Sequence, residues 1–282
     1  MVCCKLHKNG DDERFIDIGR AKRIWTLPAI HSDVWQLLRL HDMLLSEIQP
    51  GDRIIYLGNY IGYGDTPIET ITEILTFRRM VLSIPGMVPS DIIYLKGVQE
   101  EMWDKLLQLQ FAPNPYQVLS YILDNGMETM LAALGCSTEA ALRATREGVL
   151  GTTRWTNVLR EKMRQTSGFS EFFSSLKRAA FTSKETTAAP VLFVNAGIDP
   201  TRTLEEQADS FWWSGQNFNE ISDTYQHFQK VIRGYDPKHQ GVNVNCATAS
   251  LDAGCGFGGP LISALIDPSK GEVEHVLDVS LA

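Results

Sequence analysis

The most informative candidate site in this sequence is a loop from which the reactive residue types are missing. The stretch IIYLGNYIGYG, residues 54–64, begins with four apolar residues that predict a buried strand, and Gly58 then begins a tight loop. Loops that follow buried strands often present catalytic side chains. Asn59, Gly62 and Tyr63 stand in this loop, so it offers an amide and a phenol but no carboxylate for acid–base chemistry or metal binding.

Five further blocks of similar character occur along the chain. They are AIHS (29–32), GVQE (97–100), NAG (195–197), GYDP (234–237) and LDAGCGFGGP (251–260). Several of them follow predicted strands, and residues at strand ends converge on one site in layered α/β folds. No Ser-His-Asp or Cys-His nucleophile arrangement stands out.

Taken in order, these blocks resemble the motifs of calcineurin-like metallophosphoesterases of the bacterial diadenosine tetraphosphatase and serine/threonine protein phosphatase type. The family's motifs are D-x-H-G, G-D-x-x-D-R-G, G-N-H-E, H-A-G and G-H-x-P, followed by a glycine-rich segment. The resemblance covers most of the chain. It implies an α/β fold with a central β-sandwich flanked by helices, and a helical cap insertion formed by residues 111–190.

In that family two divalent metals, such as Mn or Fe and Zn, activate a water and hold the phosphoryl oxygens. The family's ligands are two aspartates, an asparagine and three histidines; the matching positions here are Ala29, His31, Asn59, Val98, Asn195 and Tyr235. Only His31 keeps its type. Asn59 stands where a bridging aspartate would join both metals, and a neutral amide there argues against a dinuclear mechanism. We therefore expect no metal cofactor.

The resemblance assigns roles to three further positions. Gln99 stands where the family has the histidine that protonates the leaving group, and an amide has no usable pKa for that step. Gly62 and Tyr63 replace the aspartate–arginine pair that contacts phosphate. Binding and chemistry are therefore both expected to be impaired.

These replacements predict a pseudophosphatase, an inactive protein that binds a protein partner or a small phosphorylated, nucleotide-like ligand through the former cleft, as a regulator or scaffold. The candidate binding residues are His31, Asn59, Asn195, Arg233 and Tyr235. Without metals, clustered carboxylates would repel one another, so neutral side chains suit this cleft. Asn59 and Asn195 can hydrogen-bond across it.

Two alternatives remain open. A rebuilt single-metal site could hydrolyse a phosphoester with ligands from His31, Glu100, Asp199, Asp236 or Asp252. Alternatively, the cleft binds phosphate without turnover, through Arg233 and loop amides. The simpler interpretation of Arg233 is a surface arginine paired with Asp236. The simpler interpretation of His31 is a hydrogen-bonded loop histidine.

The pattern along the chain predicts three strand–loop–helix units, a helical middle and a β-rich end. Predicted strands cover 23–30, 54–57, 92–95, 191–194, 230–232, 242–251 and 261–266, and predicted helices cover 34–48, 68–82 and 99–109. The six-residue match of Gly254–Gly259 to G-x-G-x-x-G is followed by a proline and a strand, which excludes a dinucleotide-binding interpretation.

The composition of the chain bears on its binding to nucleic acids, its relation to membranes and the state of its cysteines. With 26 basic and 34 acidic residues, the net charge of −8 disfavours nonspecific nucleic-acid binding. No apolar run approaches a membrane span, and we expect a cytoplasmic protein of one domain with residues 1–17 as a flexible leader. The five cysteines indicate reduced thiols, and Cys3 and Cys4 receive no role.

Two side-chain groups have a plain interpretation. The aromatic residues Phe211, Trp212, Trp213 and Phe218 are expected to pack in the core, with a partner-binding patch as the alternative. The pair Glu100-Glu101 is expected on a solvated helix face.

Overall fold

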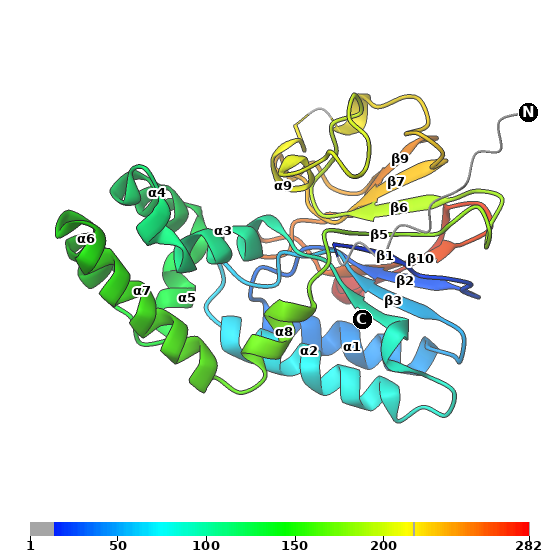
Figure 1. Ribbon diagram of the computed structural model, residues 1–282. Coiled ribbons are helices and arrows are strands. Elements are labelled where there is room, and N and C mark those ends of the chain that lie inside the picture. The colour runs from blue at the N-terminus through cyan, green and yellow to red at the C-terminus, as the bar shows by residue number, and fades with distance from the viewer. Residues whose placement is uncertain (1–13, 217, 282) are drawn as a thin grey trace, which may run out of the picture.

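Two β-sheets packed face to face form the centre of the molecule, with helices on their outer sides (Figure 1). The computed structural model describes residues 14–216 and 218–281. The predicted α/β sandwich is therefore confirmed.

The first sheet has the strand order β1-β5-β6-β7-β9-β8. Its strands are β1 (Phe15–Asp17), β5 (Ala179–Phe181), β6 (Val191–Val194), β7 (Lys230–Arg233), β8 (Asn243–Val244) and β9 (Thr248–Ser250). Because β6, β7 and β9 pair in parallel, the loops that follow them leave from the same end of the sheet, at the carboxyl ends of these strands.

The second sheet has the order β11-β10-β2-β3-β4. Its strands are β2 (Ile24–Leu27), β3 (Arg53–Tyr56), β4 (Ile92–Tyr94), β10 (Ile262–Asp267) and β11 (Glu272–Asp278). The parallel strands β2, β3 and β4 likewise bring the loops that follow them together. This arrangement gathers the sequence motifs at one end of the sandwich.

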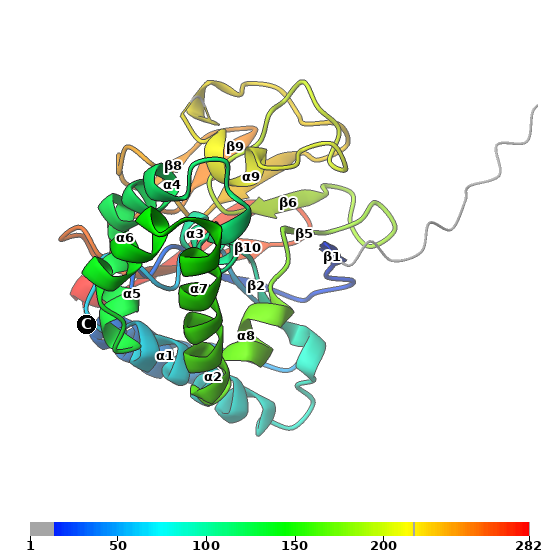
Figure 2. The same cartoon turned by 60° about the vertical axis from the view of Figure 1, so that its left-hand side comes forward.

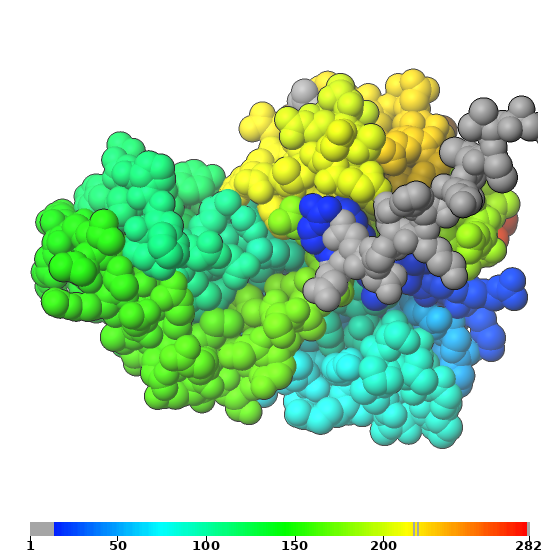
Figure 3. Space-filling model, in the orientation of Figure 1, coloured from blue at the N-terminus to red at the C-terminus, as the bar shows by residue number. Residues whose placement is uncertain are grey.

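Nine α-helices lie in the described residues. They are α1 (Val34–Glu47), α2 (Pro67–Leu82), α3 (Val98–Leu107), α4 (Pro115–Ile122), α5 (Glu128–Ala133), α6 (Thr138–Arg146), α7 (Gly148–Gln165), α8 (Phe169–Ser175) and α9 (Ser210–Trp213). Helices α1 and α2 cover the outer face of the second sheet (Figure 1). Helices α4 to α7 form a lobe beside the sandwich, which Figure 2 brings forward and Figure 3 shows as a bulky extension.

The core has two layers. Between the sheets lies an apolar cluster that includes Ile55, Phe193 and Ile232. A larger cluster fills the space between the sheets and the helices, including Leu37 of α1 and Ile74 of α2. The central strands are buried on both faces, so every residue along them contacts a core cluster. This explains why their sequences are continuous apolar runs.

Several predicted boundaries were wrong. Phe15–Asp17 forms β1, which pairs with β5, so the sheet begins inside the predicted leader. The helices of the predicted cap end at Ser175, and β5 occupies part of 111–190. β1 and β5 are only three residues long and β11 is exposed and charged, so none of the three shows the longer apolar run of a strand such as β6. Cys3 and Cys4 lie outside the described residues.

The described helices include none with both the length and the apolar character needed to cross a membrane.

Candidate functional site

The loops after β2 and β3 are joined by backbone hydrogen bonds at the end of the second sheet. The amides of Ile30 and His31 both donate to the carbonyl of Asn59, at 2.9 Å. The Ser32 amide donates to Tyr60, and the Gly64 amide donates back to His31. The first two sequence motifs therefore form one continuous backbone frame.

This frame holds four residues other than glycine in the left-handed region of backbone conformation. Their φ values are 51° for His31, 61° for Ser32, 59° for Asn59 and 61° for Tyr63. Such conformations are uncommon outside glycine and are maintained only where the surrounding structure enforces them. Backbone strain is thus concentrated in the loops in which the candidate site was predicted from the sequence.

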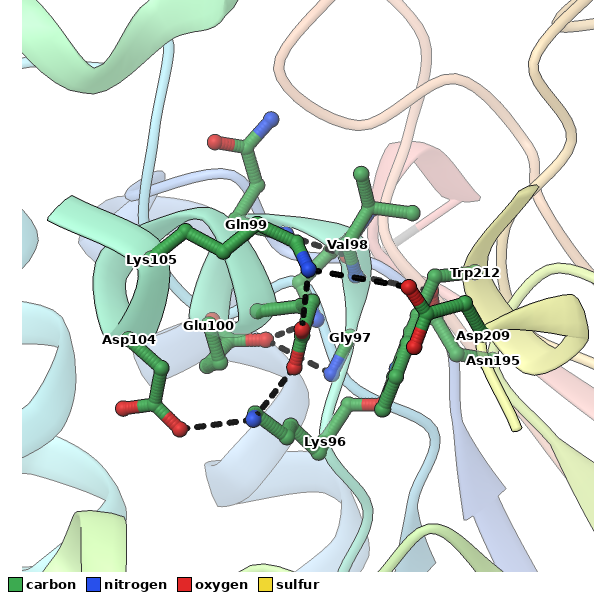
Figure 4. A network of polar contacts seen from close by, with 12 residues as sticks. Lys96, Gly97, Val98, Gln99, Glu100, Asp104, Lys105, Asn195, Asp209 and Trp212 are labelled. Carbon is green, nitrogen blue, oxygen red and sulfur yellow. Dashed lines mark hydrogen bonds and ion pairs between the residues drawn. The ribbon is translucent and has the colours of Figure 1, made fainter. Parts of the chain in front are cut away.

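The two asparagines of the cleft bind the start of α3. Asn59 Oδ1 accepts a hydrogen bond from the Gln99 amide at 3.3 Å. Asn195 Oδ1 accepts one from the Val98 amide at 3.0 Å, and Figure 4 labels both of these residues. Asn195 Nδ2 donates to the carbonyl of Leu57 at 2.7 Å. Both asparagines therefore hydrogen-bond across the cleft, as predicted, with the start of α3 as their partner, because the first amides of a helix have no partner within the helix.

Glu100 connects α3 to the loop after β3. Its buried carboxylate accepts hydrogen bonds at 2.9 Å from the amides of Gly97, Asn59 and Tyr60. Burial raises the pKa of Glu100, although these amide bonds oppose the shift. The prediction of a solvated glutamate was wrong, because this side chain turns back over the helix N-terminus rather than outward.

Glu101 is also largely buried, in an ion-pair network at the foot of α3. Its carboxylate lies 2.5 Å from Lys96 Nζ and 2.9 Å from Lys105 Nζ, and Lys96 also contacts Asp104 (Figure 4). The Lys105 ammonium lies 3.6 Å from Asp209. These contacts fix α3 beside α9, so Glu101 too was wrongly predicted as solvated.

The loop after β3 and the N-terminus of α3 approach so closely that only glycine fits between them. A Cβ on Gly97 would lie 2.2 Å from both the amide nitrogen and Oδ1 of Asn59. A Cβ on Gly58 would lie 2.6 Å from the Gly97 nitrogen. The region around the bridging position is therefore filled by contacts between these two segments.

The residues present do not fit a pair of divalent metals. Ala29 and Val98 have no donor atom, and the side-chain oxygens of Asn59 and Asn195 already accept hydrogen bonds. Burial raises the pKa of Tyr235, which keeps its phenol protonated. No three His, Cys, Asp or Glu side chains of residues 14–216 and 218–281 are grouped so that they could hold a metal ion.

His31 is enclosed by aromatic rings. The rings of Tyr63, Tyr235 and Phe257 contact it edge-on, with centroid separations of 5.3, 5.5 and 5.1 Å. Within the described part of the chain neither ring nitrogen has a partner of good hydrogen-bond geometry, although the Ile61 backbone lies near enough to the ring to oppose the shift of the His31 pKa. Burial lowers the pKa of His31 to about 4, so the imidazole is neutral near pH 7.

The helical lobe closes over the position of the family's catalytic acid. Gln99 Nε2 donates to the carbonyl of Asn125 at 3.1 Å, and the Tyr63 amide donates to Gly126 at 3.1 Å. A Cβ on Gly62 would lie 2.3 Å from Gln99 Oε1. Gln99, Gly62 and Tyr63 thus form a packed junction with the turn between α4 and α5.

Arg233 is a buried structural residue. Its guanidinium contacts Asp236 at 3.0 Å, donates to the Gly215 carbonyl at 2.7 Å and to Ser250 Oγ at 3.0 Å, and lies 4.5 Å from the centre of the Phe218 ring. The predicted pairing with Asp236 is confirmed, but the surface position was wrong, since Arg233 is 1% exposed. With all three nitrogens engaged, Arg233 is not free to bind an anion.

Only some of the residues proposed for a rebuilt metal site lie together. Glu100 is held by backbone amides, and Asp199 accepts hydrogen bonds from Thr201 in its own loop. Asp252 does lie close to Asp236, whose amide it accepts at 2.9 Å. His239, which shows no ligand spacing in the sequence, lies with its Nδ1 3.2 Å from Asp252; its place two residues after Pro237 is the one sequence signal that could have pointed to it.

The accessible part of the cleft is a cavity of about 400 Å³ beside His31. Its lining includes Ser32, Asp33 and Asp65, and Trp35 stands at its rim with 73% of its surface exposed. Neither Lys nor Arg is among the described residues that line it. The cavity therefore presents acidic and aromatic groups but no cation.

The aromatic residues after the fourth motif are mostly core. Phe211, Trp212 and Phe218 are buried, as predicted, while Trp213 is 38% exposed. Trp212 donates its indole N–H to the Lys96 carbonyl at 2.9 Å.

Two sheets that direct the motif loops to one end, with α3 beginning at the third motif, define a calcineurin-like metallophosphoesterase fold. The sequence resemblance is confirmed at this level. A candidate diadenosine tetraphosphatase of known structure matches with a TM-score of 0.54 and 14% identity, over 94% of this chain and 97% of its own. A cold-active protein-tyrosine phosphatase from a psychrophilic Shewanella species matches with a TM-score of 0.50 and 11% identity, over 96% and 85%.

A serine/threonine phosphatase from Saccharomyces cerevisiae matches more weakly, with a TM-score of 0.48 and 11% identity over 91% of this chain and 78% of its own. No family model matches the chain, and no curated protein sequence matches it. At these identities the similarity is one of fold, and the chemistry must be argued from the site itself.

Proposed function

We propose that this chain is a catalytically inactive protein with a phosphoesterase fold, which binds a protein partner at the former cleft. One observation supports this most directly. The side-chain oxygens of Asn59 and Asn195, which stand at two metal-ligand positions, accept hydrogen bonds from the first amides of α3. These groups stabilise the closed arrangement of the loops and present no anionic ligand set to a metal.

The cavity beside His31 favours a protein partner over a phosphorylated ligand. Phosphate recognition generally uses Arg, Lys or a cluster of free amides. The described lining instead contains Asp33 and Asp65, and Arg233, the cation that the motifs suggested, is engaged elsewhere. An exposed tryptophan at the rim of a cavity is the kind of residue that contributes strongly to protein–protein interfaces.

The inactive state is tested by elemental analysis of the purified protein, together with phosphatase assays in added manganese. We expect no stoichiometric metal and no turnover above a blank. Stoichiometric metal with turnover that is lost in His31→Ala would contradict the proposal.

Partner binding is tested by quantitative co-purification from native cells with Trp35→Ala and, as the matched control, Phe111→Ala. Both side chains are strongly exposed, at 73% and 79%, and Phe111 lies outside the cavity lining. We expect the partner to be lost with Trp35→Ala and kept with Phe111→Ala. Equal recovery with both variants would count against binding at this cavity.

One observation favours the alternative, a divergent phosphoesterase with a rebuilt site. His239 Nδ1 lies 3.2 Å from Asp252, and a histidine beside a carboxylate is a common element of metal and acid–base sites. However, Asp252 also accepts the amides of Asp236 and Gly254, which commits both of its oxygens. The manganese assay described above, repeated with His239→Ala, decides between the two functions.

A further inference from the structure

A second cavity lies at the end of the sandwich opposite the motif loops. It has a volume of about 1050 Å³ and lies between the start of β7, the β8–β9 turn and the β10–β11 turn. These three chain segments lie at the right-hand end of the sheets in Figure 1. Lys230 begins β7 and Arg233 ends it, so the two ends of this strand are about 10 Å apart. The cavity is therefore separate from the former cleft.

Lys230 points into the space between the two sheets. Alternate residues of a strand share a face, so Lys230 lies on the same side of β7 as Ile232, which belongs to the cluster between the sheets. A Cβ built on Gly271 would lie 3.6 Å from the Cβ of Lys230, which places the lysine stem against the β10–β11 turn. Lys230 is thus a charged residue on the face of β7 whose other residue, Ile232, belongs to the apolar cluster between the sheets.

The ammonium of Lys230 has no carboxylate within 4.0 Å and no hydrogen-bond acceptor among the described residues, although the residue is only 7% exposed and lines the cavity. An inward lysine can protect an edge strand from aggregation, but β7 is paired on both sides, with β6 and β9. The stem of Lys230 is buried while its ammonium reaches the cavity, where water or an anion must solvate it.

The rest of the lining fits an anion. Lys270 adds a second cation, whose nearest carboxylate, Asp267, is 3.7 Å away, and Glu272 is the one acidic residue among the described lining. The side chains of Gln229 and Asn245 supply neutral amides, and the exposed thiol of Cys246 lies on the same wall. Such a mixture of ammonium and amide donors suits a small oxyanion.

We propose that this cavity binds a small organic oxyanion, with a phosphate or carboxylate group held by Lys230. The site is independent of the proposed function at the former cleft.

Cys246 provides a built-in reporter for the test. The rate of its alkylation by a neutral maleimide is measured by peptide mass spectrometry, with the partly buried Cys136 on the helical lobe as internal reference. Phosphate and citrate serve as the two oxyanion probes, and sodium chloride at matched ionic strength controls for screening. We expect a saturable slowing at Cys246 alone, and the more effective probe identifies the preferred oxyanion.

Two lysine variants then locate the charge. Lys230→Met should weaken the protection about tenfold, the change expected when one charged hydrogen bond is lost. Lys238→Met, at an exposed lysine outside the cavity, should leave it unchanged. Equal protection in Lys230→Met and wild type, protection by chloride alone, or no protection by either probe would overturn the proposal. Should Lys230→Met fail to fold, isothermal titration with the same probes decides instead: saturable binding to the wild-type protein that is weakened in Lys270→Met supports the proposal, and the absence of saturable binding overturns it.

Discussion

The carboxylate of Glu100 accepts the backbone amide of Asn59 at 2.9 Å, and this bond joins the helix after β4 to the loop after β3. The same side chain accepts the amides of Gly97 and Tyr60. One buried acid therefore organises the two segments that the sequence identified as the centre of the site. Its role in this structure is to hold the backbone rather than to present a charge to solvent.

Replacement of this acid should destabilise the protein. In Glu100→Gln an NH₂ group takes the place of one carboxylate oxygen and faces backbone donors, which leaves at least one buried amide without an acceptor. We expect a loss of about 3 kcal/mol in the free energy of unfolding, measured by urea denaturation. Glu69→Gln, at an exposed position in the first turn of α2, should change stability by less than about 1 kcal/mol. Similar losses in the two variants would contradict this assignment.

Gly97 should be required for its small size rather than for its backbone conformation. Its φ is −97°, which any residue can adopt, but an added Cβ would lie 2.2 Å from Asn59. We expect Gly97→Ala to lower the unfolding free energy by about 3 kcal/mol, as overpacking of a tight contact does. Gly148→Ala has open space but a φ of 80°, and should lose only about 1 kcal/mol. A Gly97→Ala protein as stable as the Gly148→Ala protein would show that the two segments can separate freely.

Arg233 should behave as part of the core. Arg233→Met leaves Asp236 buried without its cation, and we expect a loss of about 3–5 kcal/mol in urea denaturation. Adding Asp236→Asn should restore part of that loss, because the uncompensated charge is then removed. Arg202→Met breaks the half-exposed pair with Asp199 and should cost less than about 1 kcal/mol. An Arg233→Met protein with wild-type stability would return Arg233 to the list of residues available for a ligand.

His31 should make the protein less stable in mild acid. Its pKa is lowered from 6.5 to about 4 by burial, so between these values the unfolded chain binds the proton and the folded chain does not. The stability contribution is complete above pH 6.5 and is lost as pH falls toward 4, by about 3 kcal/mol in total. Unfolding free energies measured from pH 7 to pH 4 should therefore fall less steeply in His31→Phe than in wild type.

The control for this pH dependence is His275→Gln, which removes an exposed histidine on β11. It should keep the wild-type slope. If His31→Phe also keeps that slope, the imidazole is protonated in the folded protein and the aromatic enclosure does not exclude water from it.

The sequence by itself determined the fold and showed which residue types stand at the motif positions. The apolar run at 191–194 matches β6, and the runs at 54–57 and 92–95 match β3 and β4 to within one residue at each end, because fully buried strands require consecutive apolar residues. The positions of Ala29, Asn59 and Val98 could be matched to a metal-binding motif without coordinates, since motif spacing is a property of the chain. Short strands such as β1 and β5 could not be found, because pairing with distant segments decides them.

Only the tertiary structure decided which groups are free. Glu100 and Arg233 look like surface charges in the sequence, yet both are buried because backbone amides and carbonyls from distant loops surround them. Local sequence carries no record of those partners, which come from segments up to 41 residues away for Glu100 and 37 for Arg233. The unpaired Lys230 likewise became visible only when two sheets closed around it. The sequence indicated which motif positions differ from the family's metal ligands, and the packing of distant segments determined what the side chains at those positions contact.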